Sequence, residues 1–70
     1  MSDLDRRLLE AHARDDRAAL IALYAEAGET AQTETARGFY LTHAYVYALE
    51  AGDRRAAALH AALKAMGREA

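Results

Sequence analysis

The sequence predicts an all-α fold: a small array of four helices, joined as antiparallel hairpins in a single domain over residues 1–70, with the third helix central. Proline is absent and 19 of the 70 residues are alanine. Alanine, leucine, glutamate and arginine, which dominate the chain, are strong helix formers. Strand-forming residues are few, and no window alternates apolar and polar residues with the period of a strand. Glycine and aspartate separate segments whose apolar residues recur at helical spacing.

The first helix is expected over residues 3–13. Ser2 and Asp5 have the spacing of a capping box, and the acidic groups of Asp3 and Asp5 are favourable at the positive end of a helix. One apolar stripe repeats at i, i+4 and i+7 and consists of Leu4, Leu8 and Ala11. This helix therefore has one face to bury against a neighbour.

The second helix is expected over residues 17–27. Asp15 or Asp16 can cap its start, because a short acidic side chain accepts hydrogen bonds from the first free N–H groups. One face carries Leu20, Leu23, Tyr24 and Ala27. Gly28 is expected to end the helix as the left-handed residue that commonly follows a last turn.

Residues 29–37 hold three threonines and a glutamine, which is typical of either a loop or the polar first turns of a helix. The candidate N-caps are Thr30 and Thr33. We favour a third helix that starts near Ala31, continues through Gly38 and ends at residue 52.

The fourth helix is expected over residues 54–66. Gly52 is a stop signal and Asp53 directly after it is a start signal, so a tight turn should join the third helix to the fourth. Gly67 is expected to close the fourth helix.

The third helix is apolar on most of its sides. The second and fourth helices are expected to cover one side of it. This side carries Leu41, Ala44, Tyr45, Ala48, Leu49 and Ala51. Two further pairs, Phe39 with Val46 and Tyr40 with Tyr47, fall on other sides. Two interpretations remain open: the third helix is a hub with the other three around it, or one aromatic face stays outside and pairs with a second chain.

Residues 38–63 resemble a tetratricopeptide or Sel1-type helical hairpin. The resemblance rests on aromatic residues in the first helix, a turn at Gly52 and Asp53, and an alanine-rich second helix. Tyr45 and Lys64 stand where that pattern has small residues, and the closing proline is missing. The resemblance implies hairpin geometry and a tendency to bind proteins.

The candidate interaction residues all lie on the expected third helix: Phe39, Tyr40, His43, Val46, Tyr47 and Glu50. His43 shares an edge with Glu50 and lies beside Tyr47, and such a cluster can perform acid–base chemistry or bind a small ligand. It is equally typical of a polar edge on a packed helix. No nucleophile adjoins a base, and no glycine-rich phosphate loop occurs, so we expect no enzyme. No histidine has a partner at metal-ligand spacing, so we expect no metal and no cofactor.

Charge and hydropathy narrow the class of partner. The net charge is −2 with the signs interspersed, so no basic stripe indicates nucleic-acid binding. Arg54 and Arg55 can pair with Glu50 or Asp53, so a DNA-binding role is not needed to explain this basic pair. The longest apolar run is too short to span a bilayer, and no secretory signal is visible, so we expect a cytoplasmic protein.

The expected function is that of a small helical protein–protein interaction or scaffold protein that self-associates as a homodimer. The alternative is a small-ligand-binding protein or accessory enzyme subunit that uses the cluster of His43, Tyr47 and Glu50. Eight arginines against one lysine, together with the abundant alanine, are typical of a GC-rich bacterial genome.

Overall fold

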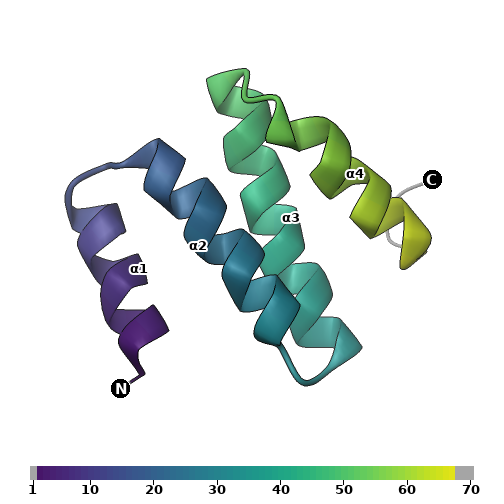
Figure 1. The fold of residues 1–70 in the computed structure, drawn as a ribbon, viewed down its shortest axis with the longest axis horizontal. Helices are drawn as coiled ribbons and strands as arrows, with labels where there is room; N and C mark the ends of the chain where they lie inside the picture. The colour runs from purple at the N-terminus through teal and green to yellow at the C-terminus, as the bar shows by residue number, and fades with distance from the viewer. Residues whose placement is uncertain (1, 68–70) are drawn as a thin grey trace.

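The computed structural model describes residues 2–67 of the chain and confirms the all-α prediction. The four helices are α1 (Asp3–Ala13), α2 (Arg17–Thr30), α3 (Glu34–Ala51) and α4 (Arg55–Ala65), and residues 2–67 contain no strand. Each helix packs against the next one in the chain, as Figure 1 shows. α3 packs against both α2 and α4, and α2 packs against both α1 and α3, so these two helices share the central position. The hub interpretation, with all three other helices around the third, is wrong because α1 packs against α2.

The helices form a flat array. The Cα positions extend over 33 × 29 × 12 Å, so the shortest dimension is less than half of either of the others. A flat array leaves much of every helix open on its two broad sides. Burial is therefore concentrated along the three lines where neighbouring helices touch.

Three of the helices begin with a side-chain cap. The caps are Ser2 on Asp5, Asp16 on Ala19 and Thr33 on Ala36, each with an oxygen that accepts a backbone N–H at 3.1 Å. Such caps satisfy N–H groups that have no partner within the first helical turn. The predicted starts of α1 and α2 are confirmed, and of the two candidate threonines it is Thr33 that caps α3.

The predicted end of the second helix at Gly28 is wrong. Gly28 lies inside α2, which continues to Thr30. A Cβ atom on Gly28 would lie 2.8 Å from Cδ2 of Leu41, so the missing side chain allows α2 and α3 to approach closely. The structure also shows that residues 31–33 form the connection, so α3 begins at Glu34 rather than near Ala31.

The predicted tight turn between α3 and α4 is confirmed. Gly52 follows α3 with φ of 64°, in the left-handed region that glycine adopts without strain. The backbone N–H of Asp53 then donates to the carbonyl of Ala48 at 2.8 Å, which closes the end of α3. The helix that follows begins at Arg55, one residue later than expected.

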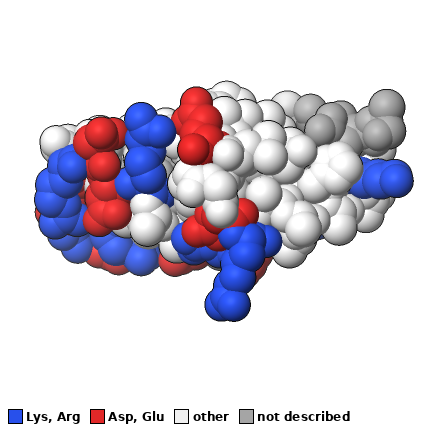
Figure 2. Space-filling model, turned by 90° about the horizontal axis from the view of Figure 1, so that it is seen from above, with Lys and Arg blue, Asp and Glu red and all other residues white. Residues whose placement is uncertain are grey.

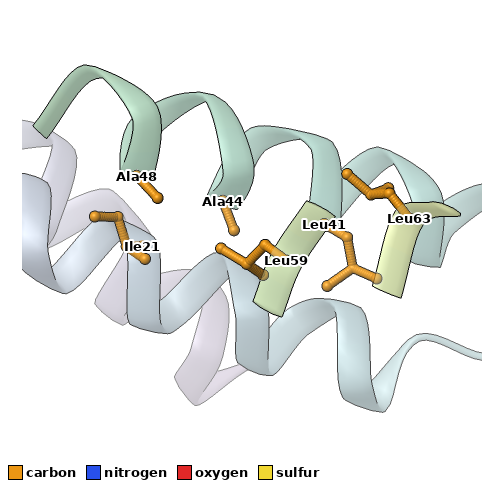
Figure 3. Packing of buried hydrophobic residues seen from close by; sticks show 6 residues of the cluster. All are labelled: Ile21, Leu41, Ala44, Ala48, Leu59 and Leu63. Atoms are coloured by element: carbon orange, nitrogen blue, oxygen red, sulfur yellow. The ribbon is translucent and has the colours of Figure 1, made fainter. Parts of the chain in front are cut away.

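The main core lies where α2, α3 and α4 meet. Figure 3 shows its buried residues, which are Ile21, Leu41, Ala44, Ala48, Leu59 and Leu63. Ala44 and Ala48 are fully buried, and their small side chains let the larger side chains of α2 and α4 approach the backbone of α3. A smaller contact between α1 and α2 buries Ala11 and Leu20.

Leu49 and Ala51 were expected on the covered side of the third helix, and both expectations are wrong. Ala51 is exposed, and the side chain of Leu49 is 55% exposed. At 100° per residue Leu49 lies about 80° around the helix from Leu41, towards the outer side. Because α2 and α4 both cover the side of Leu41, Ala44 and Ala48, neither reaches Leu49.

Candidate functional site

An aromatic cluster joins three helices around Tyr24. The ring of Tyr24 on α2 stacks on His43 and Tyr47 of α3, with ring centroids 5.1 and 5.8 Å apart. The ring of Tyr40 lies 6.3 Å away in a tilted arrangement. Contacts at these separations add attraction beyond the burial of apolar area. Tyr40 and Tyr47 are therefore half-buried by α2.

His12 of α1 completes the cluster. Its Nε2 atom and the hydroxyl of Tyr24 share a hydrogen bond of 2.9 Å, and its ring meets that of Tyr47 edge-on at 6.3 Å. Burial raises the pKa of Tyr24, and the neighbouring Tyr47 and Tyr40 raise it further. The raised pKa favours the protonated hydroxyl, and its hydrogen bond with His12 joins α2 to α1.

His43 is oriented by its own helix. Its Nδ1 atom lies 2.9 Å from the carbonyl oxygen of Phe39, and because a carbonyl only accepts, this nitrogen carries the proton. The ring of Phe39 packs on the same imidazole, with centroids 4.4 Å apart. Phe39 thus forms the outer end of the aromatic cluster.

Glu50 is bonded to α2 rather than to His43. Its Oε1 atom accepts from Nη1 of Arg17 at 3.1 Å. The guanidinium of Arg17 also lies over the ring of Tyr47, 5.8 Å from its centroid, and bonds to Asp15. The hydrogen bond to Asp15 is the main cause of the raised pKa of Arg17. His43 and Glu50 are thus held by different partners, which is the arrangement of a packed polar edge.

The outer side of α3 carries an exposed apolar stripe, here called the outward stripe. It consists of Thr35, Phe39, Thr42, Val46 and Leu49, all of them exposed. The three large side chains have exposed fractions of 56% for Phe39, 45% for Val46 and 55% for Leu49. Soluble proteins often expose a single large apolar residue, but three on one helix face form a patch.

A groove lies between α2, α3 and α4, with a volume of about 780 Å³. Its apolar lining includes Leu41, Leu59 and Met66, and charged residues at its rim include Arg37 and Arg55. The groove was not anticipated from the sequence. α4 diverges from α3 beyond the turn that joins them (Figure 1), and no sequence signal predicts that divergence.

The structure brings most of the predicted interaction residues together, but as a cluster packed against α2 rather than as an open face. Tyr40, His43 and Tyr47 meet at Tyr24, while Val46 stands apart from the aromatic cluster on the outward stripe. Sequence reasoning placed Tyr24 on the inner face of the second helix but did not connect it with the third. It also missed the roles of His12 and Arg17, for which no spacing along the chain gives a signal.

Metal, membrane and charge features add little to the candidate site. Within residues 2–67, no group of three or more His, Cys, Asp or Glu side chains is placed to hold a metal ion. No helix in that part of the chain is long and apolar enough to cross a bilayer. Figure 2 shows acidic and basic side chains intermixed over the α1 end and a mostly uncharged surface towards α4.

Comparison with protein-family models, with curated proteins and with solved structures gave no match for this chain.

Proposed function

We propose that this protein is a small helical protein–protein interaction protein that self-associates through the outward stripe of α3. The observation that carries the proposal is the exposure of Phe39, Val46 and Leu49 on one side of the central helix. The two helices that pack on α3 within residues 2–67 are α2 and α4, and both cover the opposite side, around Ala44 and Ala48, so neither lies over this side. A second chain is the element that can cover it.

The magnitude of the burial supports association. Fully burying an apolar side chain of this size contributes about 1.5–3 kcal/mol relative to leaving it exposed. Because these three side chains are already half-buried, covering them contributes on the order of 3 kcal/mol per protomer. Small helical chains have thin stability margins, so a gain of this size is significant for the fold as well as for binding.

We favour this role over a ligand-binding or accessory-enzyme role at His43, Tyr47 and Glu50. Glu50 is neutralised by Arg17, and His43 uses its Nδ1 proton on the carbonyl of Phe39. The intermixed charges support a protein partner rather than a nucleic acid. We place this role in the cytoplasm. The arginine- and alanine-rich composition, which is typical of a GC-rich bacterial genome, supports a bacterial cell.

The test is sedimentation velocity on three chains over a range of concentrations. We expect the natural sequence to form a concentration-dependent dimer and the Phe39→Ser, Val46→Ser double variant to associate at least ten-fold more weakly. Leu9→Ser is the matched control, because Leu9 is 57% exposed but lies on α1. A natural chain that stays monomeric at several hundred micromolar would contradict the proposal.

A further inference from the structure

The spacing of the outward stripe is that of a helix-pairing seam. Its residues are separated by four, three, four and three positions: Thr35, Phe39, Thr42, Val46 and Leu49. Alternating steps of three and four keep apolar side chains on the line along which two helices pair as a coiled coil. α2 and α4 cover a different side of α3, so within residues 2–67 this seam has no helix against it. We propose that α3 pairs antiparallel with α3 of a second copy, about a two-fold axis at Thr42. This inference rests on the proposed function and specifies its geometry.

The stripe is complementary to itself only in the antiparallel direction. With the axis at Thr42, Leu49 lies level with Thr35 of the second copy, and Phe39 lies within one residue, about 1.5 Å along the helix, of Val46 of the second copy. Each large side chain then meets a smaller one, and the two Thr42 hydroxyls meet at the axis. A parallel pair would instead place Phe39 against Phe39 and leave Thr35 opposite Thr35, which fills the seam unevenly.

Electrostatics favours the same direction. None of the five residues of the stripe is charged. Antiparallel pairing sets the positive end of one helix dipole beside the negative end of the other, whereas parallel pairing aligns like ends. Glu50, at the edge of the stripe, is paired with Arg17 of its own chain, so it adds no uncompensated charge to the seam.

The proposed contact is small, and its strength follows from its size. An 18-residue helix is about 27 Å long and about 10 Å wide, so its outer side offers a strip on the order of 300 Å². A standard stable interface buries about 800 Å² per partner. We therefore expect a micromolar or weaker dimer in rapid exchange with the monomer.

Single-cysteine variants test the geometry, since the chain contains no cysteine. Thr42 and Thr35 are both exposed on the stripe, so Thr42→Cys and Thr35→Cys form a matched pair. In the antiparallel dimer the two copies of position 42 meet at the axis, whereas the two copies of position 35 lie about 21 Å apart along the helices. A disulfide needs Cα atoms within about 7 Å.

Under a mild oxidant we expect Thr42→Cys to give at least ten-fold more disulfide-linked dimer than Thr35→Cys. Adding Phe39→Ser to Thr42→Cys should lower that yield at least ten-fold, and adding Leu9→Ser should not. Circular dichroism confirms that each variant remains helical before the yields are compared.

Three other outcomes would contradict the inference, and each identifies which part of it is wrong. Equal yields from Thr42→Cys and Thr35→Cys indicate parallel pairing. If neither variant cross-links while sedimentation shows a dimer of the natural chain, the seam is wrong and the proposed function stands. If neither cross-links and the natural chain is monomeric, both the seam and self-association fail.

Discussion

At the scale of single residues, Gly28 shows how a missing side chain determines the distance between two helices. It lies inside α2, where glycine is unfavourable by about 0.8–1 kcal/mol relative to alanine. A Cβ atom there would lie 2.8 and 2.9 Å from Cδ2 and Cγ of Leu41, closer than carbon atoms approach. The close packing of α2 on α3 therefore depends on glycine at this position.

Gly28→Ala should destabilise the protein although alanine is the better helix former. Overpacking a core costs about 1–3 kcal/mol, which exceeds the gain in helix propensity. We expect a net loss of about 1 kcal/mol in the free energy of unfolding, measured by urea denaturation. In a Leu41→Ala background, where the clash is absent, the same substitution should stabilise. A higher midpoint for Gly28→Ala in the otherwise natural chain would contradict the packing at this contact.

Gly28 and Tyr24 also show the limits of reading single residues from sequence. Glycine either ends a helix or permits close contact, and the spacing along one chain does not distinguish the two. Tyr24 was placed on the correct face of α2, but its stacking on His43 and Tyr47 depends on how α2 lies across α3. Contacts between helices depend on how the helices pack, and the sequence pattern of a single helix carries no information about that packing.

At the scale of elements, the first turn of α4 depends on Asp53. Its Oδ1 atom accepts the backbone N–H of Arg55 at 2.8 Å, and its carboxylate also bonds to the guanidinium of Arg55 at 2.9–3.0 Å. The side-chain bond from Arg55, followed by the backbone bond, lowers the pKa of Asp53 to about 2. The carboxylate is thus bound more tightly in the folded chain than in the unfolded one.

Stability should therefore depend on the ionisation of Asp53 in acid. A lowered folded-state pKa contributes stability that is fully present above about pH 4 and is lost as the pH falls through 2. We expect Asp53→Asn to lower the melting temperature at pH 6, and the difference from the natural chain to shrink steadily as the pH falls from 4 to 2. Thermal melts across this range, repeated in an Arg55→Gln background where the difference at pH 6 should shrink, measure the effect. A difference that stays constant with pH would contradict it.

The four elements themselves were predictable because their signals are local. Capping side chains at Ser2, Asp16 and Thr33, and the turn at Gly52 and Asp53, depend on residues within a few positions of one another. The faces of α3 were predicted in part. Ala44 and Ala48 are buried as expected, but Leu49 and Ala51 are exposed, because the width that two neighbouring helices cover depends on where they sit around α3.

At the scale of the whole molecule, a flat array makes stability depend on neighbours. α2 and α3 each pack against two helices, whereas α1 and α4 lie at the two ends of the array. The sequence predicted this order of hairpins, but not that α2 shares the central place with α3. It did not predict the groove between α2 and α4 or the flatness of the array, because both depend on crossing angles that arise from ridge-and-groove packing along whole helices.

The two end helices should differ in how readily they detach. Ala11 is the buried residue of α1, whereas α4 inserts two buried leucines, Leu59 and Leu63, into the main core. The ion pair between Arg7 and Glu26 adds little to α1, because both side chains are substantially exposed and water screens them.

Local opening of α1 exposes Ala11 and the facing Leu20 of α2, which is less apolar area than opening of α4 exposes at its two leucines and the core that they cover. We expect the slowest amides of α1 to exchange at least ten-fold faster than those of α4, and those of α2 and α3 to exchange slowest of all, when hydrogen exchange is followed by NMR. The comparison of α1 with α4 is internally matched, since each is an 11-residue helix at an end of the array. Exchange in α1 as slow as in α3 would mean that the chain opens only as one unit, and that the end helix is held by more than its contact with α2.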